Sequence, residues 1–527
     1  MLSRGFRGSQ PRPPHIHSCK AWLLPIRAAS TQPSTPADAL YIVGPSGQKW
    51  EPVIGLEVHA QLNSQTKLFS SALSSSSASP NTNVSTIDAA FPGTLPRLNG
   101  ACVRLGVTTA LALSSTVQLR SSFDRKHYFY GDLPQGYQIT QLFEPIARGG
   151  QLAIGKMDGL PYAKTVEIQQ IQIEQDSGKS VQGLTEGQTL VDLNRAGVGV
   201  LEIITEPDLR SSTETVTFLK KLQRLLWYIN VSASEMDEGA WRCDVNVSVR
   251  PAGGPLGART EIKHLVKFTS IKSAIEHEID RQIEVLESGK QVAQETRGYD
   301  VHRGTTFKLR SKEESQDYRY MPEPDLPQIL LSQTYIDDVA KSLPEPLDTR
   351  RNRLMAEYSL THYQVEVLMD EPDAVEYFEQ VAHRRSGKKA ANWVIGELFG
   401  WLKMRNLRLR ESPVEPHRLG TLLDLVESGS LSGLRAKDAL HMMVDGDARD
   451  PTAIATEKGW VQNNDQNELE QLCDDLIAQH PDIADRVRGG KDRLIKFFVG
   501  EVMKQTKGKS NPVIVAGIFR DKLLSSK

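Results

Sequence analysis

Two side chains that could bind a hard cation stand two residues apart in one short stretch of the sequence. In VIGLEVHAQL, residues 53–62, Glu57 and His59 alternate with apolar residues. Strict alternation predicts a β-strand, in which residues two apart project from the same face. The carboxylate and the imidazole could therefore ligate a cation or transfer a proton. They could equally form the solvated polar face of an amphipathic strand.

Two later segments bring further carboxylates to the polar faces of predicted strands. In TVEIQQIQIEQDSGK the alternation slips near Gln169, as a β-bulge would cause, and then places Glu174 and Asp176 on the polar face. In LEIITEPD, Glu202 alternates with apolar neighbours and Glu206 follows it.

Carboxylates gathered on neighbouring strands repel one another unless cations neutralise them. Mg²⁺ binds a few carboxylates together with substrate phosphates, so this pattern favours a magnesium and nucleotide-phosphate site. The sequence contains no GxxxxGK[ST] loop, which argues against a P-loop mechanism.

The strands that would position these groups indicate one sheet. Alternation recurs in WRCDVNVSVRP, residues 241–251, and TEIKHL, residues 260–265, is expected to add one more strand. Strict alternation favours an antiparallel sheet with one covered face over a parallel sheet buried on both faces. From about Ile336 onward, apolar residues recur at helical spacing. The sequence therefore predicts an α+β fold.

Length and composition narrow the class of protein. A chain of 527 residues is too long for one core, so roughly two to four domains are expected. Hydrophobic residues make up 39% and charged residues 24%, as in soluble globular proteins. The net charge of −2 means that any contact with nucleic acid depends on a local basic patch. The sequence shows neither a CxxC pair nor an apolar run long enough to span a membrane.

The N-terminal segment differs from the rest of the chain. Only basic charges precede Asp38, and Ser, Thr and Pro are frequent. This composition is typical of a transit peptide and predicts import into the mitochondrial matrix. A disordered basic tail is the alternative. Residues 1–45 are therefore excluded from the predicted fold.

Two segments carry cations that could contact phosphate. FDRKHYFYGDLPQGYQIT places Lys126 beside several aromatic residues, which could stack on a base or pack in the core. Near the C-terminus, a basic cluster of Lys504, Lys507 and Lys509 follows an apolar helical stripe. This cluster could contact nucleic-acid phosphates, or it could be a solvated group of charges.

Taken in order, the longer motifs resemble one family, the B subunits of the glutamyl-tRNA(Gln)/aspartyl-tRNA(Asn) amidotransferases, in a mitochondrial form. The motifs are IGLEVHAQL, NTNV, HYFYGDLPQGYQIT, VDLNRAG, LEIITEPD, EGAWRCDVNVSVRP, RTEIK, SKEESQDYRYMPEPDLP, AANWVIGEL and FFVGEVMKQTKGKSNP. Each motif alone is weak evidence for the family. Together and in this order they are specific for it, and they span residues 51–524.

The resemblance implies a ligase that converts Glu-tRNA(Gln) to Gln-tRNA(Gln). In this family an A-type amidase partner releases ammonia from glutamine, and a small C-type or fungal F-type partner completes the complex. The B-type chain transfers the ATP γ-phosphate to the tRNA-bound glutamate, and ammonia displaces that phosphate. Phosphoryl transfer needs mainly positioning and charge neutralisation, so ATP and Mg²⁺ are the expected cofactors.

The same resemblance assigns roles to individual residues. The catalytic and magnesium-binding set is Glu57, His59, Glu174 and Glu202. Candidates for ATP or substrate contact are Lys126, Lys179, Asn194, Arg195, Asp176 and Glu206. Candidates for tRNA contact are Lys504, Lys507 and Lys509.

The resemblance also implies a domain order. Residues 46–335 would form an antiparallel-sheet catalytic cradle domain that resembles the glutamine synthetase fold. Residues 336–460 would form an all-α helical domain, and residues 461–527 a small α-helical tail domain that contacts tRNA.

The sequence departs from the family pattern at several positions. Family members often hold zinc with two cysteine pairs. The matching positions here are Ser70, Ala72, Ser85 and Asp88. No thiolate remains there, so zinc is not expected. Gln175 stands where a second acid is common, and Gln135 stands where lysine is usual.

Two other classes of function stay open at this point. One is a tRNA-binding scaffold that has lost catalysis, suggested by the missing cysteines and by Gln175. The other is a free-standing carboxylate–amine ligase for a small molecule, against which the basic C-terminal cluster argues. ATP hydrolysis that depends on mis-charged tRNA separates the amidotransferase from the scaffold, and weak tRNA affinity would favour the small-molecule ligase.

Overall fold

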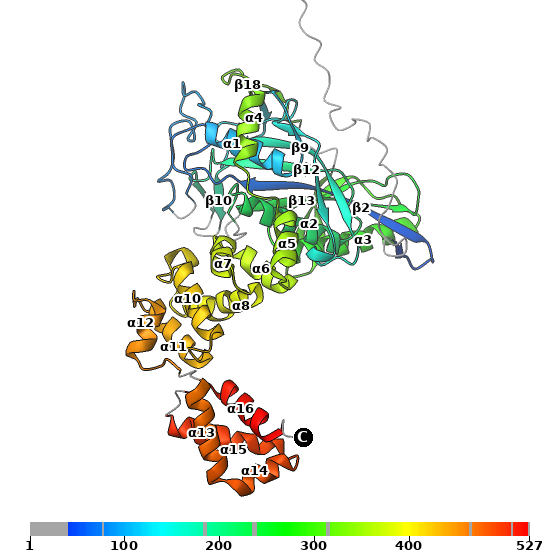
Figure 1. The fold of residues 1–527 in the computed structure, drawn as a ribbon. Helices are drawn as coiled ribbons and strands as arrows, with labels where there is room; N and C mark the ends of the chain where they lie inside the picture. Colours follow the sequence, from blue (N-terminus) through cyan, green and yellow to red (C-terminus); the bar gives the residue numbers. More distant parts are fainter. Residues whose placement is uncertain are drawn as a thin grey trace, which may run out of the picture. The chain divides into compact units, whose positions relative to one another are not determined.

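A computed structural model describes residues 41–75, 78–182, 187–233, 240–311, 317–462, 466–506 and 510–524. The chain divides into two compact units between Pro346 and Leu347. The N-terminal unit is built on a large β-sheet and the C-terminal unit is helical (Figure 1), which confirms the α+β fold class.

The domain boundary predicted at residue 335 falls inside helix α4 (Gln333–Lys341), which belongs to the N-terminal unit. This helix lies against α1 (Gly100–Ala112), and Arg104 Nη2 donates to Ser342 Oγ at 2.9 Å just after α4. These contacts explain why the sheet-based unit extends beyond the predicted boundary. The second boundary, at residue 460, stays a prediction.

The large sheet contains eleven strands. Its main path runs in the order β16–β15–β14–β13–β2–β12–β9–β7–β3, while β1 pairs with β2 and β8 pairs with β9. The bounds are β1 Ile42–Val43, β2 Lys49–Gln61, β3 Thr116–Val117, β7 Ala147–Arg148, β8 Gln151–Ile154, β9 Lys164–Gln175, β12 Gly199–Thr205, β13 Trp241–Pro251, β14 Thr260–Leu265, β15 Glu295–Asp300 and β16 Thr305–Ser311. The sheet is mixed rather than purely antiparallel, because β14 and β15 pair in parallel.

The central strand β2 follows the predicted alternation. Its residues Leu56, Val58 and Ala60 are buried, whereas Glu57 and His59 between them are partly exposed. Strands β12 and β13 pair with β2 on its two sides. Polar side chains of these three neighbouring strands can therefore gather on one face.

Strand β9 contains the predicted β-bulge. Its register against β12 passes from Gln170 directly to Ile168, so Gln169 has no partner there. Ile168 and Ile171 are consequently both buried. The bulge resets the alternation and leaves Glu174 on the face opposite to Ile171.

Helices cover the apolar face of the sheet. Gly106 lets α1 approach β9 closely, because a Cβ at this position would lie 2.9 Å from the Ile173 side chain. Helices α2 (Ser212–Tyr228) and α3 (Phe268–Glu287) pack against each other, and α3 also lies against β13.

A small sheet lies over part of the polar face. It consists of β5 (Asp124–His127), β6 (Tyr137–Thr140) and β17 (Met321–Pro322), with β5 in the middle. Thr140 Oγ1 donates to Gln172 Oε1 of β9 at 3.1 Å. Two further strand pairs complete the unit: β4 (Arg120–Ser121) with β18 (Ile329–Leu330), and β10 (Lys179–Gln182) with β11 (Thr189–Asp192).

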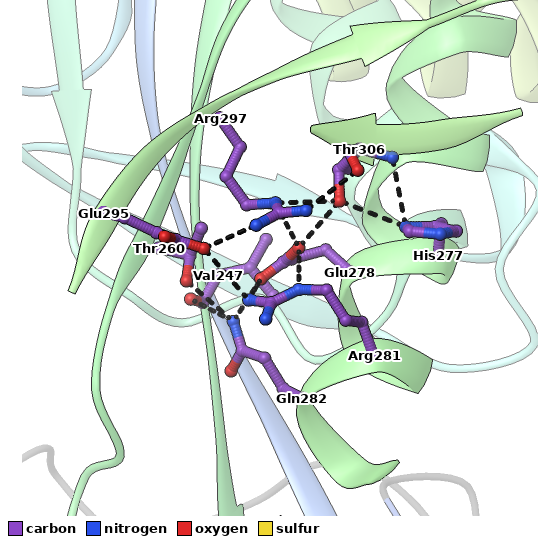
Figure 2. A network of polar contacts seen from close by, with 9 residues as sticks. All are labelled: Val247, Thr260, His277, Glu278, Arg281, Gln282, Glu295, Arg297 and Thr306. Carbon is purple, nitrogen blue, oxygen red and sulfur yellow. Dashed lines mark hydrogen bonds and ion pairs between the residues drawn. The ribbon is translucent and has the colours of Figure 1, made fainter. Parts of the chain in front are cut away.

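A buried polar network fixes α3 to the β15–β16 edge of the sheet (Figure 2). Glu278 on α3 is fully buried and accepts from Arg281 Nη2 at 2.6 Å and from Gln282 Nε2 at 2.8 Å. Thr306 Oγ1 donates to the same carboxylate at 3.0 Å, and Arg297 Nε lies 3.4 Å from it. Two guanidinium groups therefore compensate the charge of Glu278.

The first described residues belong to the folded unit. Ile42 and Val43 form β1 and pair with Trp50 and Lys49 of β2. This corrects the N-terminal assignment of residues 1–45, because main-chain hydrogen bonding holds residues 42 and 43 in the sheet. Residues 1–40 of that segment lie outside the described part of the chain.

The C-terminal unit is built from helices. Their bounds are α5 Leu347–Tyr358, α6 His362–Asp370, α7 Ala374–Ala382, α8 Gly387–Ala391, α9 Phe399–Met404, α10 Pro416–Glu427, α11 Gly433–Val444, α12 Pro451–Glu457, α13 Gln466–Gln479, α14 Pro481–Arg488, α15 Ile495–Gln505 and α16 Pro512–Leu524. Helices α13 to α16 share a core in which the rings of Phe498 and Phe519 stack at 4.9 Å. Among the described helices, none combines the length and apolar character needed to cross a membrane.

Candidate functional site

Three predicted ligands meet on the polar face of the large sheet. His59 on β2 and Glu202 on β12 lie opposite each other in the strand register. His59 Nε2 lies 3.5 Å from Glu174 Oε1 and 3.6 Å from Glu202 Oε1. One donor atom from each residue lies within 4.8 Å of the other two, which is close enough to share a cation. These three residues form the ligand triad.

The ligand triad carries an excess of negative charge. Burial, and then the charge of Glu174, raises the pKa of Glu202 well above its ordinary value, while Lys126 opposes this shift. Burial alone would lower the pKa of Lys126, but Tyr320 and the two carboxylates raise it. Lys126 Nζ also lies 5.0 Å from the centre of the Tyr318 ring. A bound cation would relieve the repulsion between the two carboxylates.

Glu57 belongs to a neighbouring acidic group and not to the ligand triad. Its carboxylate lies within 4.8 Å of those of Asp244 and Glu261. Lys263 Nζ lies 2.7 Å from Asp244 Oδ2 and 2.8 Å from Glu261 Oε1. Although burial opposes it, Lys263 lowers the pKa of Asp244 to about 2. This group therefore already contains a cation of the chain itself.

The ligand triad fits a divalent cation. Among the described residues, His59 is the only basic side chain within 4.0 Å of the Glu174 or Glu202 carboxylate. A buried and a partly buried carboxylate with so little compensation are costly unless a cation joins them. Mg²⁺ commonly takes one or two carboxylates and completes its shell with water and substrate phosphates.

Asp176 is bound to two arginines. Arg242 Nη2 donates to Asp176 Oδ1 at 2.7 Å, and Arg195 Nε lies 3.5 Å from Asp176 Oδ2. Arg195 also donates to the main-chain oxygens of Ser177 at 3.0 Å and Gly178 at 2.6 Å. The charge of Asp176 is thus balanced within the chain, and Arg195 holds the turn after β9.

Asn194 holds a loop in place. Its side chain is buried, and Nδ2 donates to Ser79 O at 2.7 Å while Oδ1 accepts from Asn83 N at 2.9 Å. Both ends of the amide are therefore used by main-chain groups of the segment that contains the NTNV motif.

Three other predicted contacts lie outside the ligand triad. Lys179 is exposed at the start of β10. Glu206 follows β12, and burial, together with Asp208 and Glu167, raises its pKa. Lys504 is exposed on α15 in the C-terminal unit, whereas residues 507 and 509, the other two lysines of the basic cluster, lie outside the described residues.

The positions that match the family's zinc ligands surround a buried ion pair. Lys67 Nζ lies 3.0 Å from Asp88 Oδ2, and both side chains are buried. Ser70 Oγ and Ser85 N donate to the same oxygen at 3.3 Å and 2.9 Å. Gly197, with φ 81°, lies so close that a Cβ would be 2.5 Å from Asp88 Oδ1. An ion pair and hydrogen bonds connect these segments.

The two glutamines that replace an acid and a lysine of the family pattern contact each other. Gln175 Nε2 donates to Gln135 Oε1 at 3.1 Å, and Gln135 Nε2 donates to Ile87 O at 2.9 Å. Because Gln175 is buried, its amide needs such a partner. Compared with the family pattern, the chain therefore lacks both an acid at position 175 and a lysine at position 135, and two neutral side chains pair there instead.

Sequence reasoning missed four residues that lie near the ligand triad: Arg242, Lys263, Tyr318 and Tyr320. The alternation in WRCDVNVSVRP places Arg242 on a polar strand face, so the sequence alone indicates a positive charge on that face. Its position opposite His59 depends on the pairing of β13 with β2, for which the sequence holds no local signal.

Comparisons with known proteins agree with the fold and with the motifs. The family model described as the GatB/GatE catalytic domain matches residues 52–337, and the model described as the GatB domain matches residues 376–523. The chain is 43% identical over 485 residues to the B subunit of the aspartyl/glutamyl-tRNA(Asn/Gln) amidotransferase from Rickettsia rickettsii, covering 92% of this chain and 100% of the relative. The corresponding protein from Rhodospirillum rubrum is 44% identical over 485 residues, covering 92% of this chain and 99% of the relative.

Proposed function

This chain belongs to the B-subunit family of the aspartyl/glutamyl-tRNA(Asn/Gln) amidotransferases, and we propose that it amidates an amino acid carried by mis-charged tRNA. The proposed reaction converts Glu-tRNA(Gln) to Gln-tRNA(Gln) at the expense of ATP. The enzyme is then a carbon–nitrogen ligase whose nitrogen comes from glutamine through an amidase partner.

The single observation that carries this proposal is the ligand triad. An imidazole and two carboxylates, of which Glu174 is buried and Glu202 partly buried, converge on one point with an excess of negative charge. Such a point needs a cation, and a cation held by few protein ligands has room for phosphate oxygens. ATP and Mg²⁺ are therefore the proposed cosubstrate and cofactor.

The residues suggest how the chain promotes the reaction. His59, Glu174 and Glu202 would hold Mg²⁺, which when bound supplies positive charge at the transferring phosphate. Lys126 lies close enough to Glu174 and Glu202 to be held in its charged form, and it can bind a phosphate or carboxylate oxygen. The small sheet lies over part of this face, and in the proposed reaction it would limit the access of water to an acyl phosphate until ammonia attacks the carbonyl carbon.

The remaining parts of the proposal concern partners and domains. An A-type amidase and a small third protein would complete the complex, and the cradle would share the glutamine synthetase fold. The C-terminal helices would contact tRNA through the basic cluster, of which Lys504 is the described member. The basic, acid-poor N-terminal segment supports a mitochondrial matrix location, which N-terminal sequencing of the chain purified from mitochondria tests. An unprocessed chain found outside mitochondria would contradict it.

The test uses the complete complex with Glu-tRNA(Gln), γ-labelled ATP and ammonia, which bypasses the amidase. Label is expected to leave ATP only when mis-charged tRNA is present, and Gln-tRNA(Gln) is expected to form in equal amount. Uncharged tRNA(Gln) is the control. tRNA binding without any phosphoryl transfer would instead support a scaffold role and overturn the proposal.

A further inference from the structure

Arg242 lies in line with two members of the ligand triad, His59 and Glu202, across the large sheet. Its position on β13 is opposite His59 on β2, and His59 is opposite Glu202 on β12. Residues directly opposite each other in antiparallel strands project from the same face. The guanidinium group therefore belongs to the face that carries the triad, on the side of His59 away from Glu202.

Asp176 fixes the direction of Arg242. The bond from Arg242 Nη2 to Asp176 Oδ1 measures 2.7 Å, and Asp176 itself is buried at the end of β9. This bond draws the guanidinium from β13 toward the end of β9, where Glu174 also lies. Glu174 is close enough to contribute to the raised pKa of Arg242, although burial opposes that shift.

Among the described residues, most of the hydrogen-bonding capacity of Arg242 has no partner. An arginine side chain has five N–H donors, and among the described residues only Asp176 accepts a hydrogen bond from Arg242. The side chain is 23% exposed, so the unused donors can reach a ligand. Arg195, the other arginine beside Asp176, donates instead to the main-chain oxygens of Ser177 and Gly178.

We propose that Arg242 is a substrate-binding residue that donates to the γ-phosphate of ATP, with Asp176 as the residue that positions it. This inference rests on the proposed function and adds a residue that the sequence motifs did not single out. A guanidinium group matches the geometry of phosphate oxygens and keeps its charge at any physiological pH. Arg242 and Lys126 then bring positive charge to the phosphate from two sides, the first from β13 and the second from the small sheet.

The test compares R242K with R250K in the complete complex. Arg250 is on the same strand and is likewise paired with a carboxylate, since its Nε lies 2.7 Å from Glu51 Oε2. Calorimetry measures the dissociation constants of Mg²⁺-bound ADP and of the Mg²⁺-bound β,γ-imido analogue of ATP. The ratio of the two constants isolates contacts to the γ-phosphate.

In R242K the preference for the ATP analogue over ADP should fall roughly tenfold to hundredfold, as expected for one charge-assisted hydrogen bond. R250K should keep the wild-type ratio, and both variants should melt within a few degrees of wild type. In R242A, added guanidinium ion should restore part of the lost phosphoryl transfer.

Two outcomes would overturn the assignment of Arg242. One is a wild-type ratio in R242K, and the other is an equal loss of ADP and analogue binding without guanidinium rescue. If the wild-type complex itself transfers no phosphate to Glu-tRNA(Gln), the proposed function fails, and the two failures are thereby distinguished.

Discussion

Two groups of buried or partly buried carboxylates lie in the same sheet-based unit, and they differ in how their charge is compensated. Glu278 is fully buried, yet two arginines, one glutamine and one threonine satisfy it (Figure 2). In the ligand triad, Glu174 and Glu202 share one imidazole, and neither has an arginine or lysine within 4.0 Å among the described residues. The first group lies between α3 and the β15–β16 edge, and the second lies on the polar face of β2, β9 and β12.

The difference separates a structural role from a binding role. A buried carboxylate with all its hydrogen bonds made and its charge compensated gains little from a ligand. Removing that carboxylate leaves buried cations without a partner. An incompletely compensated carboxylate destabilises the apo protein but binds a cation strongly. The neutral Gln135–Gln175 pair is a third case, because it requires no charge compensation.

The largest expected effect separates two glutamates of the β12 segment. E202Q removes a carboxylate from the ligand triad, whereas E206Q removes one that lies outside it. Loss of a metal ligand should reduce phosphoryl transfer to Glu-tRNA(Gln) by about 10³-fold, since metal charge is worth several kcal/mol in the transition state. E206Q should stay within a few-fold of wild type in the same single-turnover assay. Equal rates in the two variants would contradict the assignment of Glu202.

E278Q should act on stability and not on chemistry. Removing one partner of a buried ion pair costs about 3–5 kcal/mol. In E278Q, Arg281 and Arg297 would keep only Glu295 as a carboxylate partner. Denaturant unfolding of the chain measures this loss, and the activity per folded molecule should stay close to wild type. Without metal, E202Q should shift the melting temperature in the opposite direction, upward, by roughly 2–4 °C for each kcal/mol of repulsion relieved. A loss of stability in E202Q would contradict the view that Glu174 and Glu202 repel each other in the absence of metal.

The pH dependence of E278Q follows from the pKa of Glu278. Burial alone would raise that pKa, but hydrogen bonds from Arg281 and Gln282 lower it below its ordinary value of 4.5. A lowered pKa contributes stability above 4.5, which is lost as the pH falls through the folded-state value. The gap in unfolding free energy between wild type and E278Q should therefore be constant near neutral pH and narrow below that value. A gap that widens on acidification would contradict the charge pairing.

The smallest effect concerns the glutamine pair. Q175E buries a carboxylate beside Gln135 without a cation, which should cost about 1–3 kcal/mol. The double variant Q135K/Q175E supplies that cation and should recover most of the loss. Additive losses in the double variant, measured as a double-mutant cycle, would show that the two positions do not interact.

The sequence predicted those features that depend on local pattern. Alternation sufficed for β2, and the slip near Gln169 identified the bulge that turns Glu174 to the polar face. The grouping of ligands could not be predicted in full, because it depends on which strands pair. Glu57 and His59 share a face of one strand, yet β13 and β14 draw Glu57 toward Asp244 and Glu261, while β12 brings Glu202 to His59. The compensation of Asp176 by Arg242 depends on residues 66 positions apart, beyond any local signal.

Binding of Mn²⁺, a paramagnetic substitute for Mg²⁺, tests most directly whether the ligand triad is a cation site. Electron paramagnetic resonance counts the Mn²⁺ ions bound to complexes that contain the wild-type chain, E202Q or E206Q. Wild type and E206Q should bind the same number of ions, and E202Q should bind one fewer in the same concentration range. Identical binding in all three complexes would show that the carboxylates of the ligand triad hold no divalent cation.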